Sequence, residues 1–227
     1  MDLGSFILCL SAFSLAATGI TYGLKFVRLG NYLIGVEWMI LGFSSANALI
    51  YFLTSAAITF EIAHFFDNFS RAFGVPIVIP IGLMALTHSF RPSIKVDVAI
   101  FAVCFAVTFA LLTKAFAPIL PYFLLAMSCF YLGCLIFFTT RLARAGLWLH
   151  VCSMAVLIIL NAIIGYMDDF YKIPGDGTNI FFNFFTLALF VWSLMTVQLY
   201  YAYRALDRVQ RMGATRANYP GTAIPSR

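Results

Sequence analysis

Charged residues are scarce in this chain. Only 10% of its 227 residues are charged, whereas 63% are apolar, and the mean hydropathy is +0.95. A soluble domain of this length would lack the polar surface that it needs in water. The composition therefore predicts an integral membrane protein whose surface faces lipid over most of its area.

Long polar segments are also missing, because the apolar residues form seven blocks joined by short connections. Crossing a hydrocarbon core takes roughly 20 helical residues. The predicted spans are 5–24, 32–59, 72–87, 96–113, 119–140, 147–166 and 179–203. No basic segment precedes the first block, so we expect a helix of the mature protein there rather than a signal peptide. The sequence predicts an all-α bundle of seven transmembrane helices over residues 1–212, then a flexible cytoplasmic tail over 213–227 that begins where Gly213 ends the last helix.

Lysine and arginine are nearly absent from one set of loops. Eleven of the fourteen lie in the first, third and fifth loops or after the last span, and only Arg71, Lys114 and Lys172 lie on the other side. Short loops rich in these residues stay in the cytoplasm, so the pattern predicts an N-terminus outside and a cytoplasmic C-terminus. The short tails favour a bacterial inner membrane over a eukaryotic organelle.

The net charge of +5 belongs to this orientation signal. Basic residues at the inner rim can bind anionic lipid headgroups, and nothing in their arrangement indicates a nucleic-acid partner. The expected partners are therefore membrane lipids, with a second copy of the chain or a partner subunit as further possibilities.

Cysteine pairs with metal-binding spacing are absent, and so are lysines in the middle of spans. The five cysteines lie within predicted spans, where they act as small apolar residues, and no metal or cofactor is predicted. Arg71 followed nine residues later by Pro80 resembles the third helix of microbial rhodopsins. The resemblance ends there, because no lysine lies within the seventh span, and retinal bound as a Schiff base is excluded.

One carboxylate, that of Glu37, lies well inside a predicted span, whereas Asp97 lies at the inner end of its span. Glu37 shares one helical face with Ser44, Asn47, Tyr51 and Ser55. Lipid offers such a stripe no partners, so we expect it to face the bundle interior. It predicts a polar path for a transporter-like or solute- and ion-sensing bundle, with Arg71 and Asn161 as further candidate binding residues. The alternative is that these side chains only bond to neighbouring helices.

The third span contains Gly74, Pro76, Pro80 and Gly82. Each proline removes a backbone donor and tends to bend the helix, so we expect a kink that helps to shape the polar path. The fourth and fifth spans are apolar on all sides, which predicts scaffold or lipid-facing helices without functional residues.

Polar residues also follow the second span, in the predicted connection 60–71. Glu61, His64 and Arg71 would share one face if this stretch were helical, and Asp168 and Asp169 lie at the same outer rim. These side chains suggest a second hypothesis, an enzyme that acts on a lipid or isoprenoid at the outer rim. A third hypothesis is a structural subunit of a membrane complex, and whether the chain is an enzyme is left open.

Overall fold

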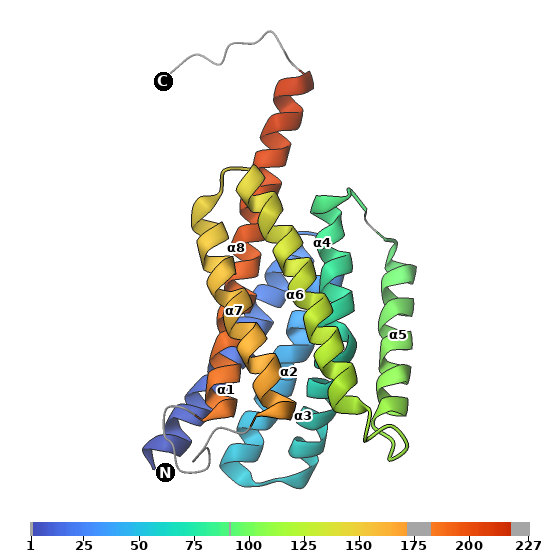
Figure 1. Cartoon of the computed structure of the whole chain (residues 1–227), viewed down its shortest axis with the longest axis vertical. Helices are drawn as coiled ribbons and strands as arrows, with labels where there is room; N and C mark the ends of the chain where they lie inside the picture. The colour runs from blue at the N-terminus through green and yellow to red at the C-terminus, as the bar shows by residue number, and fades with distance from the viewer. Residues whose placement is uncertain (1, 91, 172–182, 219–227) are drawn as a thin grey trace.

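The computed structural model describes residues 2–90, 92–171 and 183–218, and every regular element in these ranges is helical (Figure 1). The helices are α1 Leu3–Arg28, α2 Tyr32–Thr54, α3 Ala57–Phe69, the π-helical segment η1 Ser70–Val78, α4 Ile79–Thr87, α5 Ile94–Leu111, α6 Leu120–Arg144, α7 Trp148–Phe170 and α8 Phe184–Asn218.

Seven helical units in the described ranges are long and apolar enough to cross a membrane, as an integral membrane protein requires. One of them is the continuous run α3–η1–α4, which extends from residue 57 to residue 87. The predicted all-α bundle with seven candidate spans is confirmed. Successive units run in opposite directions, so α1 begins at one end of the bundle and α8 extends beyond the other (Figure 1).

The boundary predicted between the second and third spans is wrong. α2 ends at Thr54, Ser55 takes a left-handed conformation with φ 56°, and α3 begins at Ala57. The stretch 60–71 therefore belongs to the first half of the α3–η1–α4 run, which we call the third helix, and is not a connection. Its polar residues lie on one face of an amphipathic helix, a pattern that average hydropathy does not distinguish from a loop.

The expected end of the last helix at Gly213 is also wrong, because α8 continues to Asn218. A single glycine costs a helix only about 1 kcal/mol relative to alanine, which does not force it to stop. The rest of the predicted tail, residues 219–227, lies outside the described residues, as do Lys172 and the predicted start of the seventh span.

α1 and α2 pack backbone to backbone through glycines. A Cβ on Gly19 would lie 2.7 Å from the Trp38 carbonyl oxygen. A Cβ on Gly23 would lie 2.7 Å from the Gly35 carbonyl oxygen. Small residues permit such close approach between membrane helices. This pair of helices forms a tight scaffold on one side of the bundle.

The third helix contains a π-helical segment where the sequence predicted a kink. Within it the N–H of Ile79 bonds the carbonyl of Gly74, five residues earlier, and Pro76 lies inside the segment. The wider turn accommodates a proline that has no N–H and would clash with the preceding turn of an α-helix. The segment brings a widened stretch of backbone to the middle of the bundle.

Candidate functional site

A cavity of about 400 Å³ lies among α2, the α3–η1 run, α6, α7 and α8. Such a volume fits a small organic ligand. We call it the central cavity. Aromatic rings form much of its wall, contributed by Phe52, Phe60, Tyr131, Phe184, Phe185 and Trp192. Its polar lining side chains are Ser44, Ser45, Tyr51, His64, Asp67, Ser70, Arg71, Ser128, Tyr131, Asn161 and Asp168.

Several residues singled out in the sequence meet at this cavity. Tyr51 of α2, His64 of α3, Arg71 of η1, and Asn161 and Asp168 of α7 all line it, although they lie up to 117 positions apart in the chain (168 − 51). The Asn161 amide donates to the Leu157 carbonyl oxygen at 2.8 Å, within its own helix.

Other candidates lie elsewhere. Asn47 is buried, donates to the Phe43 carbonyl oxygen at 2.9 Å, and is not among the residues lining the cavity. Glu61 is exposed on α3 and also lies away from the lining. Asp169 belongs to α7, but its side chain lies outside the described residues.

Glu37 lies next to the cavity at the level of η1. Its side chain is fully buried, and its carboxyl group packs so closely on Gly74 that a Cβ there would overlap it. Ser70 of η1 lies beside this carboxyl group, and Tyr131 of α6 is within electrostatic range of it. Because Ser70 and Tyr131 also line the cavity, they connect Glu37 to it.

The polar atoms of this group lack well-formed hydrogen bonds. By distance and angle, neither carboxyl oxygen of Glu37 nor the hydroxyls of Ser70 and Tyr131 complete a hydrogen bond to a described residue, although Ser70 lies close enough to the carboxyl group to interact with it. Leaving a buried polar group unsatisfied costs about 1–3 kcal/mol. The arrangement is therefore suited to a polar group that comes from outside the chain. We refer to these three residues as the Glu37 cluster.

An ion pair closes one side of the cavity. The Arg71 guanidinium lies 2.8 Å from a carboxylate oxygen of Asp168 and 4.0 Å from one of Asp67. The first contact joins the third helix to α7. Nearby, the His64 ring stacks on Phe60 with centroids 5.8 Å apart.

The outer-rim residues do not assemble a metal centre in the described part of the chain, where no three His, Cys, Asp or Glu side chains converge. His64 and Asp168 share the cavity lining, but Glu61 does not join them.

The most informative residue missed in the sequence is Tyr131. Its helix, α6, was predicted to be scaffold because apolar residues surround it. In the structure the Tyr131 ring stacks on Trp192 of α8, with centroids 6.3 Å apart, and its hydroxyl has no partner among the described residues. A lone tyrosine in the middle of an apolar span was the available signal, since its hydroxyl requires a partner away from lipid.

Comparison of the chain with protein-family models, with curated proteins and with solved structures finds no match. The interpretation of the central cavity therefore rests on its own geometry.

Proposed function

We propose that this chain is a transporter-like or solute-sensing membrane protein that binds a small organic cation with an apolar body in the central cavity. The observation that carries the proposal is the Glu37 cluster, a buried carboxyl group and two hydroxyls without partners beside an aromatic-walled cavity.

The chemistry of the cluster favours a cationic donor. A carboxylate only accepts hydrogen bonds, and the two hydroxyls can accept as well as donate. Arg71, a basic residue of the cavity wall, is engaged by Asp168. An ammonium group would offset the cost of burying the Glu37 charge, which an uncharged ligand cannot do.

The walls of the cavity support the same ligand class. Stacked aromatic rings such as Tyr131 and Trp192 attract cations through their faces and also accommodate an apolar body. With the orientation inferred from the charge bias, the end of the cavity that carries Arg71 faces outward, so a cation enters from outside the cell.

The π-helical segment supports movement of a ligand as well as binding. π-helical turns in α-helices are frequent at functional sites, and irregular helices in transporters carry substrate sites near the middle of the membrane. η1 supplies Ser70 to the cavity wall and Gly74 to the contact with Glu37. A change in this segment would alter the cavity and the carboxyl group together.

Three probes of similar shape test the charge preference: phenethylamine, 2-phenylethanol and phenylacetate. In thermal unfolding of the purified protein, saturating phenethylamine should raise the stability by about 2.7 kcal/mol at one hundred times its Kd. The neutral alcohol should act more weakly and phenylacetate should have no effect. Equal shifts from all three, or the largest shift from phenylacetate, would contradict the proposal.

Uptake separates transport from sensing. Proteoliposomes that contain the protein should accumulate radiolabelled phenethylamine faster than empty liposomes if the chain is a transporter. Binding without uptake would identify a sensor, and neither binding nor uptake would reject the proposed ligand class.

A further inference from the structure

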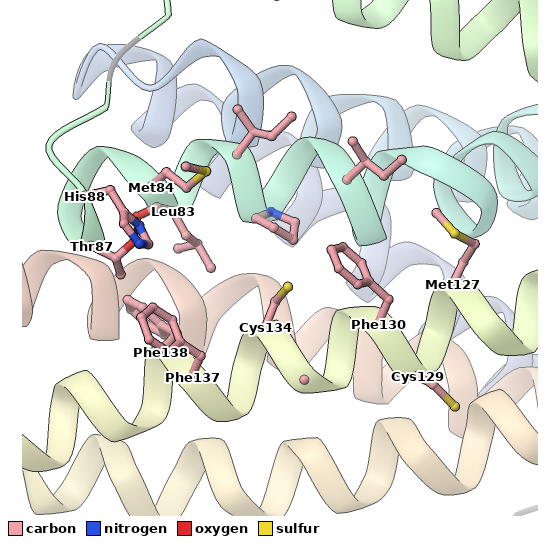
Figure 2. Close-up of a pocket in the computed structure, with 14 residues that line it drawn as sticks. Leu83, Met84, Thr87, His88, Met127, Cys129, Phe130, Cys134, Phe137 and Phe138 are labelled. Atoms are coloured by element: carbon pink, nitrogen blue, oxygen red, sulfur yellow. Dashed lines mark hydrogen bonds between the residues drawn. The ribbon is translucent and has the colours of Figure 1, made fainter.

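A second hollow runs between α4 and α6 (Figure 2). It shares no lining residue with the central cavity. Its volume is about 760 Å³, and we call it the α4–α6 groove. Apolar side chains from both helices line it, among them Ile81, Met84, Met127, Phe130 and Phe137. Gly133 also lines it, and no atom lies within 4 Å of the place where its Cβ would stand.

The groove has the length of one membrane leaflet. It extends along the third helix from Ile77, near the end of η1, to His88, just after α4, which is about 16 Å at the rise of an α-helix. Half of a typical hydrocarbon core measures about 15 Å. A single acyl chain that follows the groove would therefore reach from the middle of the bilayer to the end where α4 stops.

A polar cluster marks that end. Figure 2 shows Thr87 and His88 beside Phe137, and the His88 ring stacks on that of Phe137 with centroids 5.9 Å apart. One turn further along α6, the Arg141 guanidinium lies 5.3 Å from the Phe137 ring centroid and donates to the Thr87 carbonyl oxygen at 3.1 Å.

Arg141 has capacity to bind more. A guanidinium group has five N–H donors, and the bond to Thr87 uses one of them. None of the described ion pairs includes Arg141. A guanidinium group binds phosphate through two parallel hydrogen bonds, and His88 adds a second polar side chain at the same place. The charge at this end complements an anion, while the groove below it accommodates hydrocarbon.

We propose that the α4–α6 groove binds one anionic phospholipid, with an acyl chain between the two helices and the phosphate at Arg141 and His88. The proposal is independent of amine binding in the central cavity. It places a lipid against α4, the helix that follows η1, where lipid binding can stabilise the third helix.

The test uses protein reconstituted in vesicles of equal palmitoyl-oleoyl phosphatidylglycerol and palmitoyl-oleoyl phosphatidylcholine, then extracted in mild detergent. Native mass spectrometry counts the lipids that remain bound. We expect one retained phosphatidylglycerol per chain, and Arg141→Gln should reduce its retention about fivefold, the effect of one basic residue near a membrane surface. Arg144→Gln removes a charge from the same end of α6 at an exposed position and should change retention little.

A second variant keeps the test valid if Arg141→Gln also weakens folding, since Arg141 bonds Thr87. Gly133→Trp should fill the groove and abolish phosphatidylglycerol retention with the unfolding temperature unchanged, because nothing occupies the space beside this glycine. Val156→Trp, on an exposed part of α7, is the matched control. Equal retention of the two lipids, an equal loss in Arg144→Gln, or a dimer that covers the groove and excludes lipid would overturn the proposal.

Discussion

The two faces of α2 have opposite properties. One face carries Gly35 and Gly42 and packs on α1 with direct backbone contact. The other carries Glu37, whose carboxyl group meets η1 and has no hydrogen-bond partner among the described residues. The comparison shows that one helix contributes both a closely packed scaffold and a buried polar site. Stability should depend mainly on the glycine face, and ligand binding on the Glu37 face.

The largest expected effect on stability comes from the glycine face. Gly19→Leu places a side chain where the α2 backbone already lies, 2.8 Å from the Gly42 Cα atom. Because backbone cannot move aside as a side chain can, we expect a loss of about 3 kcal/mol, the upper part of the usual range for overpacking. Thermal or denaturant unfolding in detergent measures the loss.

Gly133→Leu is the matched control, since its added side chain meets no atom within 4 Å of its Cβ position and should leave stability nearly unchanged. Comparable losses in the two variants would show that the α1–α2 contact is not special.

Gly74→Ala tests the opposite face. The new methyl group overlaps the Glu37 carboxyl group, which can rotate away because it is a side chain. We therefore expect a smaller loss of stability, about 1–2 kcal/mol, together with a loss of phenethylamine binding. Titration calorimetry and thermal unfolding measure the two effects.

The double variant Glu37→Ala/Gly74→Ala isolates the contact. Removing the carboxyl group leaves space for the methyl group, so Gly74→Ala should cost little in the Glu37→Ala background. An unchanged cost would show that Gly74 is required for the π-helical backbone and not for its contact with Glu37.

The smallest effect should come from the ion pair between Arg71 and Asp168. Both side chains are about one quarter exposed. A double-mutant cycle with Arg71→Gln and Asp168→Asn should give a coupling of about 1 kcal/mol, the upper part of the range for exposed ion pairs. The i,i+4 pair Asp207 and Arg211, 2.9 Å apart and with the Arg211 side chain 72% exposed, is the control and should give about 0.3–0.5 kcal/mol. A coupling for Arg71 and Asp168 no larger than the control would remove this ion pair as a link between η1 and α7.

Most of the fold could be predicted because membrane helices must be long and apolar. The error at residues 55–71 has a physical cause, since the outer half of the third helix is amphipathic and one of its faces lines the central cavity. The left-handed residue Ser55, which ends α2, carries no strong sequence signal because serine is not a residue that favours positive φ.

The candidate site could be predicted only in part. Glu37 could be identified as a candidate from the sequence because a carboxylate within an apolar span is costly wherever it lies. Its contact with Gly74 could not be predicted, because helix pairing cannot be read from one sequence. Asn47 shares the predicted polar stripe with Tyr51, yet it bonds within its own helix and does not line the cavity. Periodicity indicates a face of a helix but not which neighbour covers it.

Calorimetric titration with phenethylamine tests the central claim most directly, with Glu37→Gln compared against Glu61→Gln. Both variants remove one carboxylate, but Glu37 is buried in the cluster and Glu61 is exposed on α3. Hydrogen bonds to a charged group contribute about 1.5–3 kcal/mol, so Glu37→Gln should weaken binding by roughly ten- to a hundredfold while Glu61→Gln binds as the unmodified protein does. Equal affinity in all three proteins would contradict the assignment of Glu37 to the ligand.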